Sequence, residues 1–223
     1  MVYRWALVSQ KPGVGKSTSG IFLAQALYEQ GDDPMLVDAD KGKTCLDWDE
    51  MAGGMPYPVV SKPVKQLHRT LPDIVRGRGS VVIDVPQVED HEQIAKGAML
   101  FADTWVIPIA PSPVEVRRLF RDDAFGDFIQ ELQELREELG KEKAEVVFLL
   151  TRTNTSRMTK GGPDRDVRDE LTNHEYRTLD AQIPFHDDMY RQTGGSRVRA
   201  LGTPYERVAK ELKALTPHAG DRA

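Results

Sequence analysis

The chain has 223 residues, 39% of them hydrophobic and 29% charged, with a net charge of −5. These values are typical of a soluble globular protein with room for one well-buried α/β domain over residues 1–223, and they exclude a polycation that binds nucleic acid with its whole surface. The single cysteine, Cys45, excludes a disulfide framework or a cysteine-rich metal site within one chain and fits a reducing cytoplasm. No apolar run approaches the ~20 residues of a membrane-spanning helix.

A predicted strand at residues 3–8 is followed directly by a glycine-bearing loop at residues 10–18. In such a loop, small residues let successive backbone N–H groups surround an anion, and the N-terminus of the next helix adds partial positive charge. The loop has Gln10 where the P-loop pattern G-x-x-x-x-G-K-[ST] begins with glycine, but it matches the last three positions with Gly15, Lys16 and Ser17. In a P-loop the lysine lies along the β- and γ-phosphates, and the hydroxyl binds Mg²⁺.

A helical run begins at about Thr18 and ends near Gly31, where a C-terminal glycine is expected. The alternative to a phosphate-binding loop is a strand-to-helix turn that binds no ligand. The loop lies directly between a strand and a helix, which is the position that the phosphate-binding mechanism requires. The sequence therefore favours nucleotide binding.

The missing first glycine is accompanied by an additional lysine, Lys11. The segment Lys11-Pro12-Gly13-Val14-Gly15-Lys16-Ser17 resembles the deviant Walker A box, K-G-G-x-G-K-[ST], of the ParA/MinD family of P-loop ATPases. The resemblance implies that Lys16 has the ordinary P-loop role, whereas Lys11 reaches across an ATP-sandwiched homodimer to the phosphates of the partner. It also implies that nucleotide is bound by Lys11, Pro12, Gly13, Val14, Gly15, Lys16, Ser17 and Thr18. Pro12 replaces the usual glycine and removes one N–H group from the loop.

A buried strand is predicted at residues 34–37, and it ends in Asp38-Ala39-Asp40. Ligands of open α/β sheets bind at the carboxyl ends of strands, so both acids should lie near the phosphates; a solvated acidic turn explains the spacing equally well. The ParA/MinD family carries D-x-D at this place, and the resemblance implies that Asp40 positions the attacking water and that Asp38 joins the magnesium site. Lys41-Gly42 stands where the family has Pro-Gln.

Residues 44–72 predict a helix, a loop and a short helix, with Leu46, Trp48 and Met51 on one face and the first two in the core. The β-branched run at residues 80–86 predicts a second buried strand, and Asp84 ends it in the manner of a Walker B strand. This carboxylate can hold the hydration shell of Mg²⁺. The predicted magnesium site therefore consists of Ser17, Asp38 and Asp84.

A helix at residues 88–101, a strand at 104–109 and a long helix at 114–139 follow, with Gly126 as a possible break. The long helix has a core-facing stripe of Leu119, Phe120, Phe128, Leu132, Leu135 and Leu139. A strand at 146–150 and a helix at 163–173 come next.

The last predicted elements are a strand at residues 179–184 and an amphipathic helix through Leu215 that Thr203-Pro204-Tyr205-Glu206 begins as a capping box. Family resemblance places base-contacting residues after the strand at 146–150, which makes Thr151 and Arg152 nucleotide-binding candidates. It also places Pro184 beside the adenine.

Strands, loops and helices alternate throughout, which predicts an α/β fold: a mostly parallel central sheet with helices on both faces, of the P-loop NTPase type with a deviant Walker A box. Lys11, Lys16 and Asp40 are the candidate catalytic residues for transfer of a phosphoryl group from ATP to water with Mg²⁺. The chain is most similar to the small plasmid-partition type of ParA. That resemblance implies an ATP-dependent homodimer that binds DNA non-specifically, is stimulated by a centromere-binding ParB-like partner, and associates with the nucleoid in the cytoplasm.

The C-terminal region has a local excess of basic residues that fits the DNA expectation. Two acidic residues, Glu206 and Glu211, stand among the six basic residues Arg191, Arg197, Arg199, Arg207, Lys210 and Lys213. Such a patch attracts phosphates through a salt-dependent term that is independent of base sequence. An ordinary charged helix face explains the pattern equally well.

Four other functions are weighed against DNA partition. A membrane-associated regulator of the MinD kind should end in a basic, strongly apolar helix, which residues 217–223 do not provide. A metabolic P-loop ligase or kinase similar to dethiobiotin synthetase would need an acceptor pocket, and ATPases that position other cargo share the same motifs. A single cysteine per chain is too few for a reductase of the nitrogenase type, which excludes that function.

Overall fold

The computed structural model describes residues 3–112, 114, 116, 119, 124–155, 161–185 and 194–215. In this part of the chain, eight parallel strands form one sheet in the order β3-β2-β4-β1-β5-β6-β7, with β8 paired to β6. The strands are β1 Tyr3–Leu7, β2 Pro34–Asp38, β3 Val59–Ser61, β4 Ser80–Asp84, β5 Thr104–Ile109, β6 Glu145–Thr153, β7 Arg177–Thr178 and β8 Ile183–Pro184. The helices are α1 Lys16–Glu29, α2 Thr44–Met51, α3 Leu67–Ile74, α4 Val88–Phe101, α6 Ala124–Glu138, α7 Pro163–Asn173 and α9 Pro204–Leu215. The predicted parallel sheet is confirmed.

The central strands are buried on both sides, which explains their nearly continuous apolar sequences. Every residue of β2, β4 and β5 is buried. In β1, successive side chains alternate between two separate cores: Trp5 and Leu7 belong to one, and Ala6 belongs to the other. A parallel sheet needs helices on both faces, and this pattern supplies the apolar surface for them.

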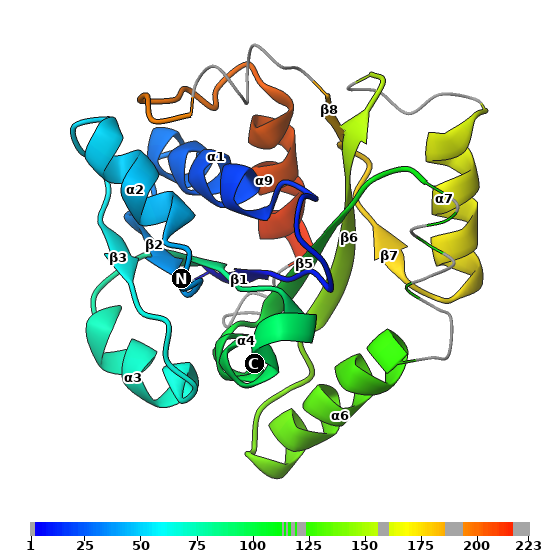
Figure 1. Cartoon of the computed structure of the whole chain (residues 1–223), viewed down its shortest axis with the longest axis horizontal. Helices are drawn as coiled ribbons and strands as arrows, with labels where there is room; N and C mark the ends of the chain where they lie inside the picture. Colours follow the sequence, from blue (N-terminus) through cyan, green and yellow to red (C-terminus); the bar gives the residue numbers. More distant parts are fainter. Residues whose placement is uncertain are drawn as a thin grey trace, which may run out of the picture.

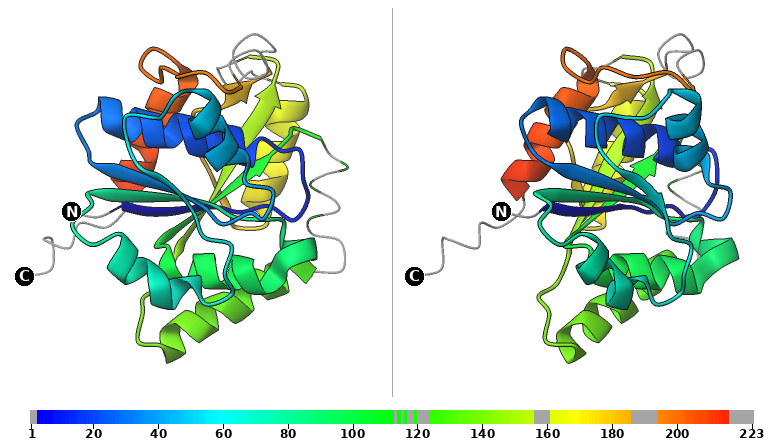
Figure 2. Two further views of the ribbon diagram at one scale, coloured as in Figure 1. Left: turned by 60° about the vertical axis from the view of Figure 1, so that its left-hand side comes forward. Right: turned by 90° about the vertical axis from the view of Figure 1, so that its left-hand side faces the viewer.

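The helices form one layer on each face of the sheet (Figures 1 and 2). Helices α1, α2 and α9 cover one face, where Phe22 of α1 stacks on Tyr205 of α9 with ring centroids 5.0 Å apart. Helices α3, α4 and α6 cover the other face, and α7 adds Val167 and Leu171 to that core. The described part of the chain contains no helix that is both long and apolar enough to span a bilayer.

Three predictions about residues 44–72 were wrong. The expected loop contains a short strand, β3, at the edge of the sheet, where its three residues are only partly buried. Met51 does not share the buried face of α2, because it is 74% exposed, whereas Cys45 and Trp48 are buried. Leu46, which was expected in the core, is only partly buried. Helix α2 has only two turns, so one narrow stripe of its surface faces the sheet. That stripe consists of Cys45 and Trp48, which are three residues apart.

Only the last two residues of the strand predicted at residues 179–184 form a strand in the structure. Thr178 ends β7, and β8 begins only at Ile183. Side chains bind the backbone in between: Arg168 donates to Leu179 O at 2.6 Å, and Glu211 accepts from the N–H of Ala181 at 3.0 Å. These side-chain contacts replace the hydrogen bonds that a continuous strand would have made.

The predicted long helix at 114–139 is described only in part. Residues 114, 116 and 119 are helical, and α6 runs without a break through Gly126. Leu119, Phe128 and Leu132 are buried as predicted, and Leu135 packs against the same core. Leu139 is 52% exposed because it lies just beyond the end of α6, and Phe120 lies outside the described residues.

Candidate nucleotide and magnesium site

Three neighbouring strands bring the predicted site together at their carboxyl ends. In the register of the sheet, Asp84 at the end of β4 pairs with Leu7 of β1 on one side and with Asp38 of β2 on the other. The loop that follows β1 therefore lies beside both acids. Ligands of open parallel sheets bind at this edge, so the sheet order by itself builds a site from segments that are far apart in the sequence.

The loop between β1 and α1 has the backbone conformation of an anion site. Gly13 and Gly15 have φ angles of 85° and 86°, a left-handed region that other residues seldom adopt. Helix α1 begins immediately after Gly15, and Ser19 N–H donates to Gly15 O at 2.9 Å. Within the described residues α1 has no side-chain cap and no acidic residue in its first turn. Its first amide groups and its positive dipole end are thus available to a phosphate.

Lys16 lies at the first position of α1 and is only 7% exposed. Burial lowers the pKa of its ammonium group, and the nearby charges of Asp84 and Asp40 partly oppose this shift. A buried ammonium is costly unless nearby negative charges balance it. The negative phosphates of a nucleotide are the ligand that this amine would bind beside its acidic neighbours.

Asp84 is fully buried, and its two oxygens differ. Oδ2 accepts a hydrogen bond from the Cys45 thiol at 3.3 Å, whereas Oδ1 has no hydrogen-bond partner among the described residues. Burial raises the pKa of Asp84 to about 6, although Ser17 and Lys16 favour its charged form. Mg²⁺ is bound by few carboxylates and keeps several waters. An unpaired buried carboxylate oxygen beside the Ser17 hydroxyl fits such a hydrated ion.

No group of three or more His, Cys, Asp or Glu side chains that could hold a metal occurs in the described ranges. The residues present therefore fit an ion whose remaining ligands are water and phosphate oxygens, as Mg²⁺ in nucleotide sites typically has. Ser17 and Asp84 would hold it. This reading does not require a closed cage of protein ligands.

Asp38 is buried next to Asp84, but its carboxylate is engaged by backbone groups. It accepts from the N–H groups of Asp40 at 3.1 Å, Cys45 at 2.8 Å and Leu46 at 3.1 Å. The last two belong to the first turn of α2, so Asp38 caps that helix from a distance. Burial raises the pKa of Asp38 despite these hydrogen bonds. Its direct role in binding magnesium remains a prediction.

Asp40 lies at the mouth of the site. Its side chain is partly exposed, Oδ1 accepts from Gly42 N–H at 2.9 Å, and its charge acts on Lys16. This position allows contact with both the phosphate region and solvent water. Lys41 and Lys43 beside it are exposed, and Lys43 has a left-handed φ of 53°. Nothing in the structure explains why lysines occupy these two positions.

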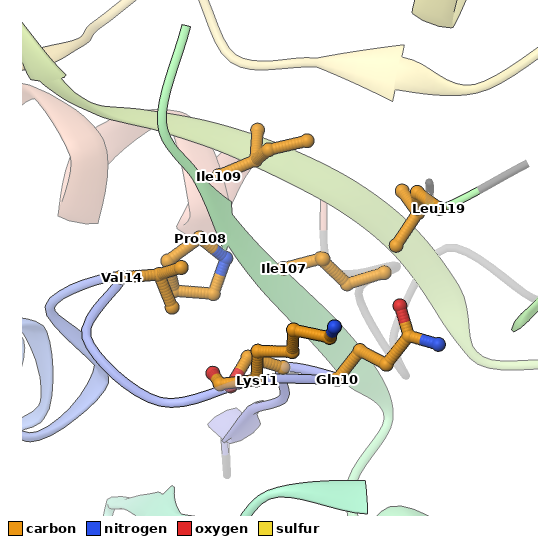
Figure 3. Close-up of a pocket in the computed structure, with 8 residues that line it drawn as sticks. Gln10, Lys11, Val14, Ile107, Pro108, Ile109 and Leu119 are labelled. Atoms are coloured by element: carbon orange, nitrogen blue, oxygen red, sulfur yellow. The ribbon is translucent and has the colours of Figure 1, made fainter. Parts of the chain in front are cut away.

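The two lysines of the loop have different surroundings. Lys16 is buried among acids, whereas Lys11 is exposed and its Nζ lies 3.9 Å from Glu89 Oε1. An exposed pair at this distance contributes little stability. In Figure 3 the side chains of Gln10 and Lys11 extend from the loop across β5. They border a pocket that is lined by Ser9, Gln10, Lys11, Val14, Ile107, Pro108, Ile109 and Leu119.

The predicted base-contacting residues occupy three different settings. Thr151 is buried at the end of β6, and its hydroxyl donates to Val14 O in the loop at 3.0 Å. Arg152 is exposed, with a left-handed φ of 56°. Pro184 is buried in β8 and pairs with Thr153. The structure thus connects Thr151 to the phosphate loop rather than to an open cavity, and contact of these residues with a base remains a prediction.

The predicted DNA-binding residues that the structure describes lie on α9 and in the segment that precedes it. Arg197, Arg199, Arg207 and Lys210 are all exposed, and Arg197 donates to Gly53 O at 3.3 Å. Lys210 pairs with Glu206 at 2.6 Å, and Lys213 pairs with Asp32. Arg191 lies outside the described residues. Ion pairs on α9 therefore compensate part of the positive charge that the sequence alone suggested.

Cys45 is a site residue that the sequence analysis missed. Its backbone N–H donates to Asp38 and its thiol donates to Asp84, so it contacts both buried acids. Burial and the neighbouring acids raise the pKa of the thiol well above its usual value, which keeps it protonated as a donor. A lone cysteine seven residues after Asp38 was the only available signal, and it does not reveal the contact with a strand 39 residues away.

A family model for the CobQ/CobB/MinD/ParA nucleotide binding domain matches residues 5–195 of the chain. The match includes the loop, all three acids and β6. None of the curated proteins compared with the chain matches it in sequence.

Solved structures share the fold at low sequence identity. Apo McdA of Cyanothece has a TM-score of 0.71 and 16% identity, covering 96% of this chain and 100% of that one. A cobyrinic acid a,c-diamide synthase from Mycobacterium smegmatis, with bound ADP and magnesium, has a TM-score of 0.67 and 18% identity over 96% and 94%. A putative plasmid partition protein from Borrelia burgdorferi, bound to AMPPNP, has a TM-score of 0.65 and 17% identity over 96% and 97%.

Proposed function

Because the chain belongs to the CobQ/CobB/MinD/ParA nucleotide-binding family, we propose that it is a Mg²⁺-dependent ATPase that works as a nucleotide-switched homodimer. One observation carries the proposal: a buried lysine at the N-terminus of α1 lies among acids, one of which presents an unpaired oxygen. This arrangement neutralises phosphate charge and leaves a position for a hydrated cation.

Each residue of the site has a distinct task in this proposal. Lys16 and the first amide groups of α1 bind the β- and γ-phosphates, while Ser17 and Asp84 hold the water shell of Mg²⁺. Bound Mg²⁺ would withdraw charge from the phosphate oxygens. Asp40 accepts a hydrogen bond from the attacking water and orients it toward the γ-phosphorus. Water then replaces ADP on that phosphorus, so the products are ADP and inorganic phosphate.

The homodimer is proposed from the position of Lys11. This side chain is exposed, and among the described residues its one ion pair is the contact with Glu89 at 3.9 Å. A lysine that is free of its own site can reach phosphates bound by a second chain. ATP, but not ADP, would offer a γ-phosphate for it to bind, which makes the dimer depend on the nucleotide.

The cargo that we propose is DNA. In this proposal the ATP-bound dimer binds DNA without sequence preference, associates with the nucleoid, and is stimulated by a centromere-binding ParB-like partner that marks a plasmid or chromosome. Four exposed basic residues support DNA binding, namely Arg197, Arg199, Arg207 and Lys210. A structural neighbour that is named a putative plasmid partition protein supports partition.

Hydrolysis is tested by phosphate release from ATP with and without Mg²⁺, using wild-type protein and Asp40→Ala. We expect Mg²⁺-dependent release by the wild type and at least a ~10-fold slower rate for Asp40→Ala, because positioning of the attacking group contributes to the rate. ATP affinity should stay unchanged, since Asp40 lies at the mouth of the site. Asp47→Ala, which removes an exposed carboxylate of α2, is the matched control. Equal rates for Asp40→Ala and Asp47→Ala would exclude the assigned role.

DNA binding is tested by fluorescence anisotropy of a random-sequence duplex at several salt concentrations, with ATP and with ADP. We expect affinity in ATP to fall steeply with salt, because each neutralised phosphate releases counterions. An affinity that is independent of salt, or equal with both nucleotides, would contradict the switch. Co-sedimentation with liposomes tests the MinD-like alternative in the same nucleotide states.

A metabolic ligase is the second candidate, because a cobyrinic acid a,c-diamide synthase shares the fold with a TM-score of 0.67. Such an enzyme activates an acceptor with ATP and turns over only when the acceptor is present. ATP hydrolysis that requires an added small-molecule acceptor and is unaffected by DNA would favour this candidate over the switch.

A further inference from the structure

The thiol of Cys45 lies in the centre of the site without a task in the proposed hydrolysis. Its sulfur is fully buried, 3.3 Å from Asp84 Oδ2 and 3.7 Å from Ser17 O. Its own backbone N–H is already used, because it donates to Asp38 Oδ2 at 2.8 Å. Cys45 therefore connects the two neighbouring acids, one through its backbone and the other through its side chain.

The contact with Asp84 has a direction. A protonated thiol has one hydrogen to donate, an ionised carboxylate can only accept, and the distance to Asp84 is shorter than the distance to Ser17 O. The hydrogen bond favours one orientation of the Asp84 carboxylate about its last torsion angle, which has broad minima. Oδ1 is consequently left as the one oxygen of Asp84 without a partner in the described structure.

We propose that Cys45 is a positioning residue for the magnesium site, which holds Asp84 Oδ2 so that Oδ1 is presented to the hydrated ion beside Ser17. The proposal rests on the Mg²⁺-dependent nucleotide site described above. Cys45 itself does not touch the ion or the phosphates. Groups that orient metal-binding residues in this way typically contribute about 10- to 100-fold to metal affinity.

A purely structural role for Cys45 makes a different prediction. If the thiol only fills space next to Trp48 and Tyr57 in the core, then Cys45→Val should be the better tolerated change, because a buried hydroxyl in Cys45→Ser costs stability. If the thiol positions Asp84, then Cys45→Ser should keep the response to Mg²⁺ and Cys45→Val should lose it. Retention of the Mg²⁺ response by Cys45→Ser and its loss in Cys45→Val would therefore separate the two roles.

The experiment measures the affinity of the full-length protein for fluorescent ADP, with Mg²⁺ and with a chelator, in wild type, Cys45→Val and Cys45→Ser. The ratio of the two affinities reports magnesium coupling and needs no hydrolysis. We expect Cys45→Val to reduce this ratio about 10-fold and Cys45→Ser to stay near the wild-type ratio, with equal affinities in the chelator. Thermal unfolding without ligand shows whether both variants remain folded at the temperature of the binding measurement.

Equal ratios for the wild type and both variants would overturn the positioning role while leaving the magnesium site intact. A wild-type protein that binds ADP equally with and without Mg²⁺ would overturn the site itself, and the proposal with it. A second measurement does not depend on the variants. The chain has one cysteine, so its S–H stretching band is unambiguous in the infrared spectrum. We expect the band of a hydrogen-bonded thiol, and a band at the position of a free thiol would also overturn the proposal.

Discussion

The carboxyl ends of β1, β2 and β4 and the basic surface formed by residues 194–215 are built in different ways. At the strand ends, Lys16, Asp38 and Asp84 are buried, and the pairing of neighbouring strands fixes where the acids lie. On the basic surface, Arg197, Arg199, Arg207 and Lys210 are all exposed, and at least one of them is already paired with an acid.

The difference determines how each region can work. Buried charges act strongly on one another and on a ligand because little water screens them, so the geometry of a single side chain matters. Interactions between exposed charges are screened over about 10 Å at moderate salt, so the net charge of the surface determines binding more than the position of any one side chain. We therefore expect large and specific effects from substitutions at the strand ends, and small, additive and salt-dependent effects from substitutions on the basic surface.

The largest effect is expected for Lys16→Ala. Removing this buried ammonium leaves the phosphates and the acids without their counter-charge, and the loss of one partner of a buried charge pair typically costs about 3–5 kcal/mol. ATP affinity measured by titration calorimetry should fall at least ~100-fold. Lys65→Ala, at an exposed lysine, is the control. Retention of wild-type ATP affinity by Lys16→Ala would remove the distinction between the two regions.

Asp84→Asn should change how stability depends on pH. Burial raises the pKa of Asp84 to about 6 in the folded protein, above the ~3.9 of an unfolded chain. Folding therefore favours the neutral form of Asp84. The contribution of this group to the free energy of unfolding is fully present below pH ~4 and is lost as pH rises through ~6.

The asparagine cannot ionise, so Asp84→Asn should gain stability relative to wild type between pH 4 and 7, by on the order of 2–3 kcal/mol. Urea unfolding without nucleotide and with a chelator measures this difference. If the difference in stability between Asp84→Asn and the wild type does not change with pH, then folding does not raise the pKa of Asp84. With Mg²⁺ and ADP present, the wild type should regain its advantage.

Thr151→Val should have a smaller effect at the same edge of the sheet. The substitution removes the hydrogen bond from the hydroxyl to Val14 O while it keeps the shape of the side chain. A hydrogen bond of this kind contributes about 0.5–1.5 kcal/mol, so ATP affinity should fall about 2- to 10-fold. Thr151→Ser keeps the hydroxyl and should retain the wild-type affinity. If both variants bind as the wild type does, the contact does not organise the loop.

The smallest effects are expected on the basic surface. Arg197→Ala and Arg199→Ala should each weaken DNA binding in ATP by a few-fold, add in the double variant, and each lower the salt slope by about 1. Arg76→Ala, which removes an exposed arginine at the end of α3 on the other face of the sheet, is the matched control. A single arginine that abolishes binding would indicate a specific contact instead of a diffuse charge.

The same contrast explains which features could be predicted from the sequence. The strands that end in Asp38 and Asp84 were predicted correctly because a parallel strand buried on both faces is a continuous apolar run. The glycines at positions 13 and 15 marked the loop, and the family resemblance is confirmed over residues 5–195.

What the sequence did not show depends on contacts between distant segments. Cys45 contacts Asp84, which is 39 residues away in the sequence. A local sequence pattern cannot predict a contact between segments so far apart. Arg168 and Glu211 interrupt the strand predicted at residues 179–184 by binding its backbone. The ion pairs of Lys210 and Lys213 reduce the basic excess only because Glu206 and Asp32 lie beside them in the folded chain.

Light scattering of the protein with ADP, with ATP and with a slowly hydrolysed ATP analogue tests the central claim most directly. We expect the wild type to be a monomer with ADP and a dimer with ATP or the analogue. Lys11→Ala should remain a monomer in every case and still bind ATP, because Lys11 lies outside its own acid cluster. A wild-type protein whose mass is the same with all three nucleotides, or a Lys11→Ala variant that dimerises normally, would contradict the switch.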